Sequence, residues 1–179
     1  MTRPFDVGLV LRALAFAAHK HRDQRRKGAE ASPYINHPIA VANVLVNEGG
    51  ARDADIVCAA LLHDTLEDTL TSVAELESEF GPAITGIVRE VSDDKSLPSE
   101  ARKRQQVVHA PSLSPSAKLV KLADKVCNLR DLELHPPRDW TLERRQRYFD
   151  WAKEVVDGVR GISPTLEAAF DQAYARRPR

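Results

Sequence analysis

The chain has 179 residues, of which 29% are charged and 42% are hydrophobic. This length favours one domain, expected over residues 1–179 with its core at about 6–176, and the composition argues against disorder. The 26 basic and 26 acidic side chains give a formal net charge of zero. No overall positive field would therefore draw a nucleic acid polymer to the protein.

The sequence contains no apolar run close to the roughly 18 residues that a membrane-spanning helix needs. Asp6 and Arg12 interrupt the apolar segment near the N-terminus and no cleavage site follows, which argues against a signal peptide. Cys58 and Cys127 lie in apolar, helical-looking runs without a Cys-x-x-Cys motif, so both are expected to be buried, reduced thiols. These features predict a cytoplasmic protein with no membrane partner.

Apolar residues recur along the chain at spacings of three and four, and no segment alternates regularly enough to predict a strand. Gly49-Gly50 and Gly81-Pro82 end helical segments, Ser72 with Glu75 resembles a capping box, and serines precede Pro115 and Pro164 as N-caps. The pattern predicts an all-α fold, a compact bundle of about nine helices. Their expected ranges are about 6–24, 38–48, 53–64, 72–80, 82–92, 98–109, 115–133, 141–160 and 164–176.

A long charged segment, RRKGAEASPYIN at 25–36, separates the first two predicted helices and ends at His37-Pro38. A loop of this length inside a compact domain is more often functional than accidental. Its first residues are Arg25, Arg26 and Lys27, for which anion binding and a solvated surface stay open as alternatives.

The densest group of chemically active residues is His63-Asp64-Thr65-Leu66-Glu67-Asp68, directly after the apolar run VCAALL. Neighbouring residues on a helix point about 100° apart, so His63 and Asp64 can reach one ion only near a helix end. Glu67 lies four residues after His63, and Asp68 lies four after Asp64. If the helix continues, this spacing places each carboxylate on the same face as a candidate ligand.

Two more candidate ligands come from distant segments. His37 stands at a predicted helix start, and Asp124 lies in KLVKLADKVCNLRDL among apolar neighbours, where a buried carboxylate needs a partner. Together with His63 and Asp64 they offer two imidazoles and two carboxylates, a set that suits manganese, iron or zinc better than calcium. The alternatives are that His63 is a hydrogen-bonded core histidine and that Asp124 pairs with Lys121 or Arg130.

Further polar residues are spaced for a phosphorylated nucleotide near such an ion. Asn128 follows Asp124 by four residues, and Tyr148 follows Arg144 by four. An arginine fork and an aromatic ring are groups that bind phosphate and a base. A solvated helix face is the simpler explanation for the remaining basic residues, namely Arg102, Lys103, Arg104 and Arg145.

Four strings carry a family resemblance: RRKGAEASPYINHP, AALLHDTLEDT, VSDDKSLP and KLVKLADKVCNLRDL. Together they resemble the hydrolase domain of the RelA/SpoT homologues, and more narrowly the small stand-alone alarmone hydrolases related to the metazoan SpoT homologue. The resemblance runs from about residue 10 to about residue 160 and implies an HD-type helical bundle. It implies Mn²⁺ bound by His37, His63, Asp64 and Asp124. It also implies that Glu67 and Asp68 activate or position the attacking water, with substrate contacts at Arg26, Lys27, Asn128, Arg144 and Tyr148.

The activity implied by this resemblance is removal of the 3′-pyrophosphate from guanosine tetra- or pentaphosphate. Ser99 departs from the basic residue expected there in some relatives, so no phosphate contact is assigned to it. A metal-dependent phosphatase acting on another ribose-phosphate nucleotide, such as NADPH, is an open alternative. A non-catalytic nucleotide-sensing module is another, although the intact HDTLED argues against it. The sequence leaves a homodimer as an open question.

Overall fold

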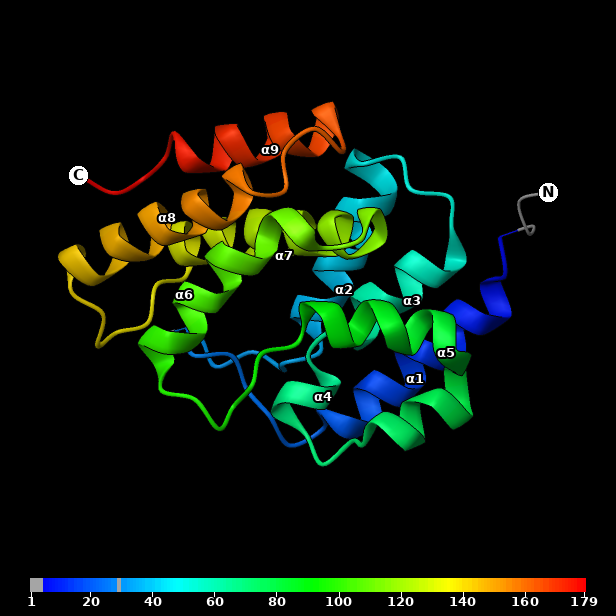
Figure 1. Ribbon diagram of the computed structural model, residues 1–179. Coiled ribbons are helices and arrows are strands. Elements are labelled where there is room, and N and C mark those ends of the chain that lie inside the picture. Colours follow the sequence, from blue (N-terminus) through cyan, green and yellow to red (C-terminus); the bar gives the residue numbers. More distant parts are fainter. Residues whose placement is uncertain (1–4, 29) are drawn as a thin grey trace.

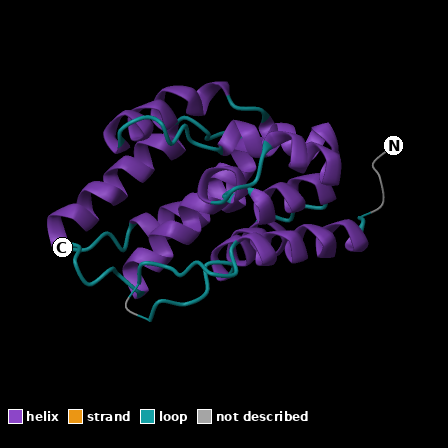
Figure 2. Ribbon diagram, turned by 90° about the horizontal axis from the view of Figure 1, so that it is seen from below, coloured by secondary structure: helices purple, strands orange, loops and turns teal. Residues whose placement is uncertain are grey.

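The computed structural model describes residues 5–28 and 30–179, and every regular element within these ranges is a helix (Figures 1 and 2). The predicted all-α fold is therefore confirmed. In chain order the elements are α1 (Val7–Lys20), α2 (Asn36–Asn43), the π-helical turn η1 (Val44–Glu48), α3 (Ala54–Leu62), α4 (Thr65–Asp68), α5 (Val73–Val91), α6 (Ser99–His109), the 3₁₀ turn η2 (Ala110–Ser112), α7 (Pro115–Leu134), α8 (Leu142–Asp157) and α9 (Pro164–Tyr174).

Helix α7 lies in the middle of the bundle and packs against α2, α3, α5, α8 and α9 (Figure 1). The buried apolar side chains form one cluster around it, which includes Leu45, Leu62, Phe149 and Phe170. The apolar run 57–62 of α3 is buried on all sides, as expected for a helix without a polar face. None of the helices in the described ranges combines the length and hydrophobicity needed to cross a membrane.

Several predicted boundaries agree with the structure because the caps form as expected. Ser72, Ser114 and Ser163 each accept a backbone N–H with the side-chain hydroxyl, at 3.1, 3.3 and 3.4 Å. Cys58 and Cys127 are buried and free, also as predicted. The first helix, however, ends at Lys20 rather than at residue 24, because the following backbone turns back on itself, with Tyr34 N–H donating to Gln24 O at 3.1 Å. Ala29, in this same loop, lies outside the described residues.

The helix expected over 53–64 ends at Leu62, and α4 begins as a separate turn at Thr65. Thr65 Oγ1 donates to Leu62 O at 2.6 Å, so a side chain satisfies a carbonyl at the end of α3. The helix therefore does not continue through the HDTLED segment, and the spacing argument for a shared helix face fails there.

The helices predicted over 72–80 and 82–92 both form, and they meet within α5 at Gly81, where the backbone leaves the helical conformation and the axis is kinked. Gly81 has φ 78° and ψ 170°, a conformation that is essentially restricted to glycine. Pro82 follows it and starts the second half of α5 without needing an N–H partner.

Replacement of Gly81 by alanine is expected to destabilise the protein by about 1–3 kcal/mol through backbone strain alone. An added Cβ at this position would meet no atom within 4 Å, so steric overlap with neighbours does not contribute. Gly86 of the same helix is equally open, and Gly86→Ala should stabilise by up to about 1 kcal/mol. Urea unfolding of both variants checks the difference, and equal effects would refute the role of the kink.

Candidate metal centre and nucleotide pocket

Four side chains from three distant segments meet in the interior. His37 Nε2 lies 3.1 Å from Asp124 Oδ1 and 3.9 Å from Asp64 Oδ2. His63 Nε2 lies 3.1 Å from Asp64 Oδ2 and 3.7 Å from Asp124 Oδ1. One ligand atom from each of His37, His63 and Asp124 lies within 4.8 Å of the others, a spacing that could hold a metal ion. Helices α2 and α7 and the end of α3 position these groups.

The end of α3 orients the ring of His63. His63 Nδ1 lies 2.7 Å from Ala60 O, and because a carbonyl can only accept, Nδ1 is the protonated nitrogen of the neutral ring. Nε2 then carries the lone pair. It is buried and, among the described residues, it has no hydrogen-bond partner. A lone pair fixed in this way by a bond to the other ring nitrogen is the usual state of a metal-binding histidine.

The two carboxylates control the protonation of this cluster. Burial by itself lowers the pKa of His63, but the negative charges of the nearby Asp64 and Asp124 carboxylates outweigh it and raise the pKa to about 10. Burial likewise opposes the ionisation of both carboxylates, but the imidazoles lower the pKa of Asp64, and Lys125 together with the imidazoles lowers that of Asp124. Without a metal, a proton on His63 therefore offsets the negative charge of the two carboxylates. A bound divalent cation would take the place of this proton.

Asp124 has partners on both of its oxygens. Oδ1 accepts from Asn128 Nδ2 at 2.7 Å, and Oδ2 lies 3.2 Å from Lys125 Nζ. Arg130 does not pair with Asp124, because it forms its ion pair with Glu48 at 2.7 Å. The alternative that Asp124 forms its ion pair with Arg130 is therefore wrong. The Asp124 carboxylate instead faces the two histidines.

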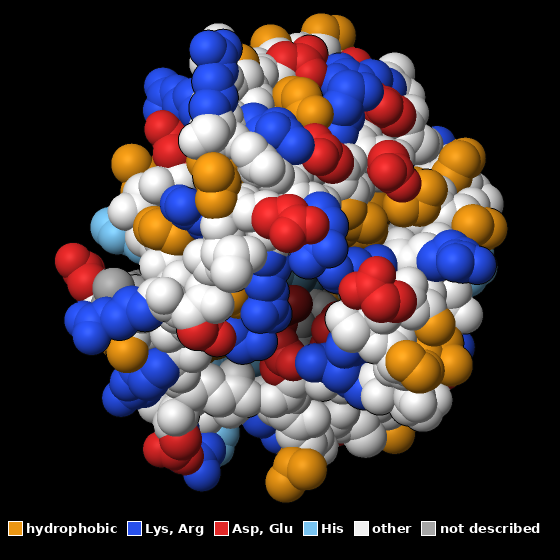
Figure 3. All heavy atoms as spheres, turned by 90° about the vertical axis from the view of Figure 1, so that its left-hand side faces the viewer, with side chains coloured by type: hydrophobic (Ala, Val, Ile, Leu, Met, Phe, Trp, Pro, Cys, Tyr) orange, Lys and Arg blue, Asp and Glu red, His pale blue; other side chains and the backbone are white. Residues whose placement is uncertain are grey.

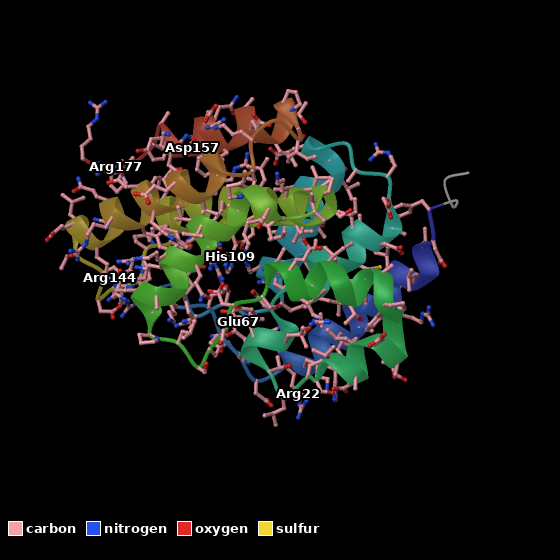
Figure 4. The ribbon with its side chains drawn as sticks, in the orientation of Figure 1. Arg22, Glu67, His109, Arg144, Asp157 and Arg177 are labelled. Atoms are coloured by element: carbon pink, nitrogen blue, oxygen red, sulfur yellow. The ribbon has the colours of Figure 1, made fainter. Side chains whose placement is uncertain are left out.

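Glu67 and Asp68 lie beside this cluster, on α4, and Glu67 is labelled in Figure 4. Glu67 Oε2 accepts the backbone N–H of Asp93 at 3.1 Å. Lys95 Nζ lies 2.6 Å from Asp68 Oδ1 and 3.5 Å from Glu67 Oε1. Burial, reinforced by the charge of Asp93, raises the pKa of Glu67. The loop between α5 and α6 therefore holds both carboxylates in place.

Sequence reasoning did not assign a role to Tyr34. Its hydroxyl lies 2.7 Å from Asp64 Oδ2 and 3.1 Å from Asp68 Oδ2, so it links a candidate ligand to a candidate catalytic carboxylate. Burial and these carboxylates raise the pKa of Tyr34 well above its ordinary value, which keeps the hydroxyl protonated. Tyr34 lies two residues before α2 and far in the sequence from Asp64 and Asp68, so no spacing pattern predicts this contact.

Two neighbouring cavities, which share several lining residues, open beside these residues. The outer one has a volume of about 870 Å³ and the inner one about 180 Å³, and both are bordered by Tyr34, Glu67 and Asp68. Figure 3 shows a hollow in one face of the molecule with acidic side chains on its floor and basic side chains around it. The outer cavity is large enough for a nucleotide.

Most of the predicted substrate contacts line these cavities: Arg26, Lys27, Asn128 and Tyr148. Arg26 is bound to Asp131 at 2.6 Å and stacks over the ring of Tyr34. Arg144 is not among the described residues that line either cavity. Its guanidinium lies 4.4 Å from the ring centre of Trp140, which borders the outer cavity, and Figure 4 shows it well separated from Glu67.

Tyr34→Phe is expected to weaken divalent metal binding by about 10-fold or more, because Asp64 loses the hydroxyl that orients it. The matched control is Tyr174→Phe, whose hydroxyl binds Asp150 at 3.1 Å and does not contact the cluster. Calorimetric titration of both variants with Mn²⁺, Co²⁺ or Zn²⁺ checks the prediction. Equal affinities in the two variants would show that Tyr34 does not support the cluster.

Comparisons with known proteins identify the family of this chain. The HD domain family matches residues 13–148. MESH1 of Xenopus tropicalis, named guanosine-3′,5′-bis(diphosphate) 3′-pyrophosphohydrolase, is 53% identical over 94% of both chains. The human protein of the same name is 52% identical over 96% of both. An Aquifex aeolicus 3′-pyrophosphohydrolase is 36% identical, but the match covers only 24% of its length.

A solved structure of a metazoan SpoT orthologue, described as hydrolysing ppGpp, superposes with a TM-score of 0.94. The two proteins are 47% identical, and the match covers 98% of each chain. The chain described here therefore belongs to the HD-domain family and, within it, to the group of small SpoT-related proteins that includes MESH1.

Proposed function

We propose that this chain is a Mn²⁺-dependent guanosine-3′,5′-bis(diphosphate) 3′-pyrophosphohydrolase, with residues 1–179 as one hydrolase domain. The observation that carries the proposal is the meeting of two imidazoles and two carboxylates at the inner cavity, next to Glu67 and Asp68, which also border the nucleotide-sized outer cavity. The function printed for the MESH1 relatives, which match nearly the whole chain, supports it. The two free, buried cysteines support the cytoplasmic location expected from the sequence.

The proposed metal ligands are His37, His63, Asp64 and Asp124. The unpartnered Nε2 of His63 and the mixed nitrogen and oxygen donor set fit Mn²⁺. When bound, the ion lowers the pKa of a coordinated water and polarises a phosphoryl oxygen.

In the proposed reaction a water oxygen bonds to the phosphorus attached to the ribose O3′, and the P–O3′ bond breaks. The bonding electrons go to O3′, which takes up a proton, and pyrophosphate leaves. Glu67 is the proposed acceptor of the water proton, because its raised pKa makes it the stronger base. Asp68, held between Lys95 and Tyr34, positions the water.

The remaining side chains orient the nucleotide and neutralise phosphate charge. Arg26 and Lys27, at the edge of the outer cavity, are proposed to bind phosphate oxygens, while Asn128 and Tyr148 border the sugar. Arg144 would act from the rim, where it stacks on Trp140. Phosphoryl transfer needs mainly positioning and charge neutralisation, so this set requires no nucleophilic side chain.

The decisive experiment is anion-exchange analysis of the products formed from ppGpp by the Mn²⁺-loaded protein. We expect GDP and intact pyrophosphate. Faster release of orthophosphate from NADPH, compared as kcat/KM, would favour the phosphatase alternative. Tight binding of ppGpp without any product would favour a sensor.

Glu67→Gln should lower kcat by about 100-fold or more, since the proposed base is lost while the shape of the side chain is kept. Glu77→Gln, an exposed change at the start of α5, is the control and should keep normal kcat. Metal content and unfolding temperature should be unchanged in both variants. Normal turnover by the Glu67 variant would remove it as the base.

Mn²⁺ affinity should fall as the pH falls, by about tenfold for each unit between about pH 8 and about pH 6. The reason is that the raised pKa of His63 leaves a proton on the metal-free site in this range, and the ion must displace it. Manganese titration followed by electron paramagnetic resonance measures the slope. His109→Asn, an exposed histidine change, should retain it, and a flat profile in the unaltered protein would contradict histidine ligation.

A further inference from the structure

The inner cavity contains charge that the proposed chemistry does not use. Beyond the residues shared with the outer cavity, it is lined by Val91, Gln106, Lys121, Lys125 and Trp151, together with His63, Asp64 and Asp124. Its volume of about 180 Å³ corresponds to about six water molecules. It therefore has room for phosphate groups.

Lys121 is a buried ammonium group that has no anionic partner among the described residues. Its residue is only 8% exposed, and its Nζ donates to Val91 O at 2.8 Å. Among the described residues, no carboxylate oxygen lies within 4.0 Å of this nitrogen. Burying an unpaired charge is costly, and a neutral carbonyl compensates only part of the cost. An anion in the cavity would supply the missing partner.

Lys125, one turn further along α7, adds a second buried cation. It is 3% exposed, lies 4.4 Å from the ring centre of Trp151, and pairs with Asp124 Oδ2 at 3.2 Å. Asp124 Oδ1 faces the histidines, so a cation bound there would share the charge of this carboxylate. Lys125 would then be less fully neutralised, and the attraction of the cavity for an anion would increase.

We propose that the inner cavity binds the terminal phosphate of a diphosphoryl group, with Lys121 as its buried contact and Lys125 beside it. The inference rests on the proposed function, because the reacting phosphorus must lie next to Glu67 and Asp68, at the junction of the two cavities. The nucleoside then occupies the outer cavity, and the 3′-diphosphate extends inward. Lys121 thereby selects a diphosphate over a monophosphate at the ribose and holds the departing pyrophosphate.

The test compares Lys121→Met with Lys118→Met in the Mn²⁺-loaded protein. Lys118 lies on the same helix, is half-buried and is not among the described residues that line either cavity, so it controls for the loss of one charge from α7. The substrates are guanosine 5′-diphosphate carrying a 3′-diphosphate or a 3′-monophosphate. For Lys121→Met we expect kcat/KM to fall by about 10- to 100-fold for the diphosphate and by less than about twofold for the monophosphate.

Calorimetric titration with inorganic pyrophosphate and orthophosphate gives a readout independent of turnover. Lys121→Met should weaken pyrophosphate binding by about tenfold or more and orthophosphate binding much less, while Lys118→Met changes neither. Equal losses for both anions, or no loss, would overturn the assignment. If ppGpp is not turned over at all, the proposed function fails, and the titration still decides whether the cavity binds pyrophosphate.

Lys121→Gln is the second variant, because it removes the charge but keeps a donor for Val91 O. It is used if Lys121→Met has a lowered unfolding temperature. The same selective loss in Lys121→Gln supports the subsite, and wild-type selectivity in a folded Lys121→Gln protein overturns it.

Discussion

The structure depends on how it compensates the charges that α7 carries into the core. Asp124, Lys121 and Lys125 are all buried, and burying such groups costs several kcal/mol each unless they are paired. Asp124 achieves this through His37, Lys125 and Asn128. Because α7 also packs against α2, α3, α5, α8 and α9, the helix that organises the core is the helix that places the central carboxylate. Folding and site formation are therefore one event, and mutations that loosen α7 should affect both.

A break in a helix is what allows adjacent residues to serve one centre. His63 follows the last residue of α3, and Asp64 precedes the first residue of α4. At the break between the two helices, the Thr65 hydroxyl donates a hydrogen bond to Leu62 O. At this point the chain can direct both side chains to one place, which a continuous helix would prevent. The same break moves Glu67 and Asp68 off the axis of α3 and against the loop that carries Asp93 and Lys95.

Acidic and basic groups alternate from the surface inward, and this order suits a highly charged nucleotide. Arg26 and Lys27 border the outer cavity, and Glu67 and Asp68 border both cavities. Lys121 and Lys125 line the inner cavity together with His63, Asp64 and Asp124. Phosphate groups on opposite sides of a ribose would each find cations, while the carboxylates between them remain available for a metal and for water. The low dielectric of the buried part strengthens each of these interactions.

The sequence by itself determined the helical class, the serine caps, the buried run of α3 and the residues that form the candidate centre, because periodicity, caps and charged residues in apolar segments are local signals. Only the tertiary structure decided that α3 stops at Leu62 and that Tyr34 links Asp64 to Asp68. It also decided that Arg130 pairs with Glu48 and that Arg144 stacks on Trp140. Within the described part of the chain, it left the buried Lys121 without a carboxylate partner. These outcomes depend on residues far apart in the chain, and the free energy of such contacts is set by distance and burial, which no local pattern encodes.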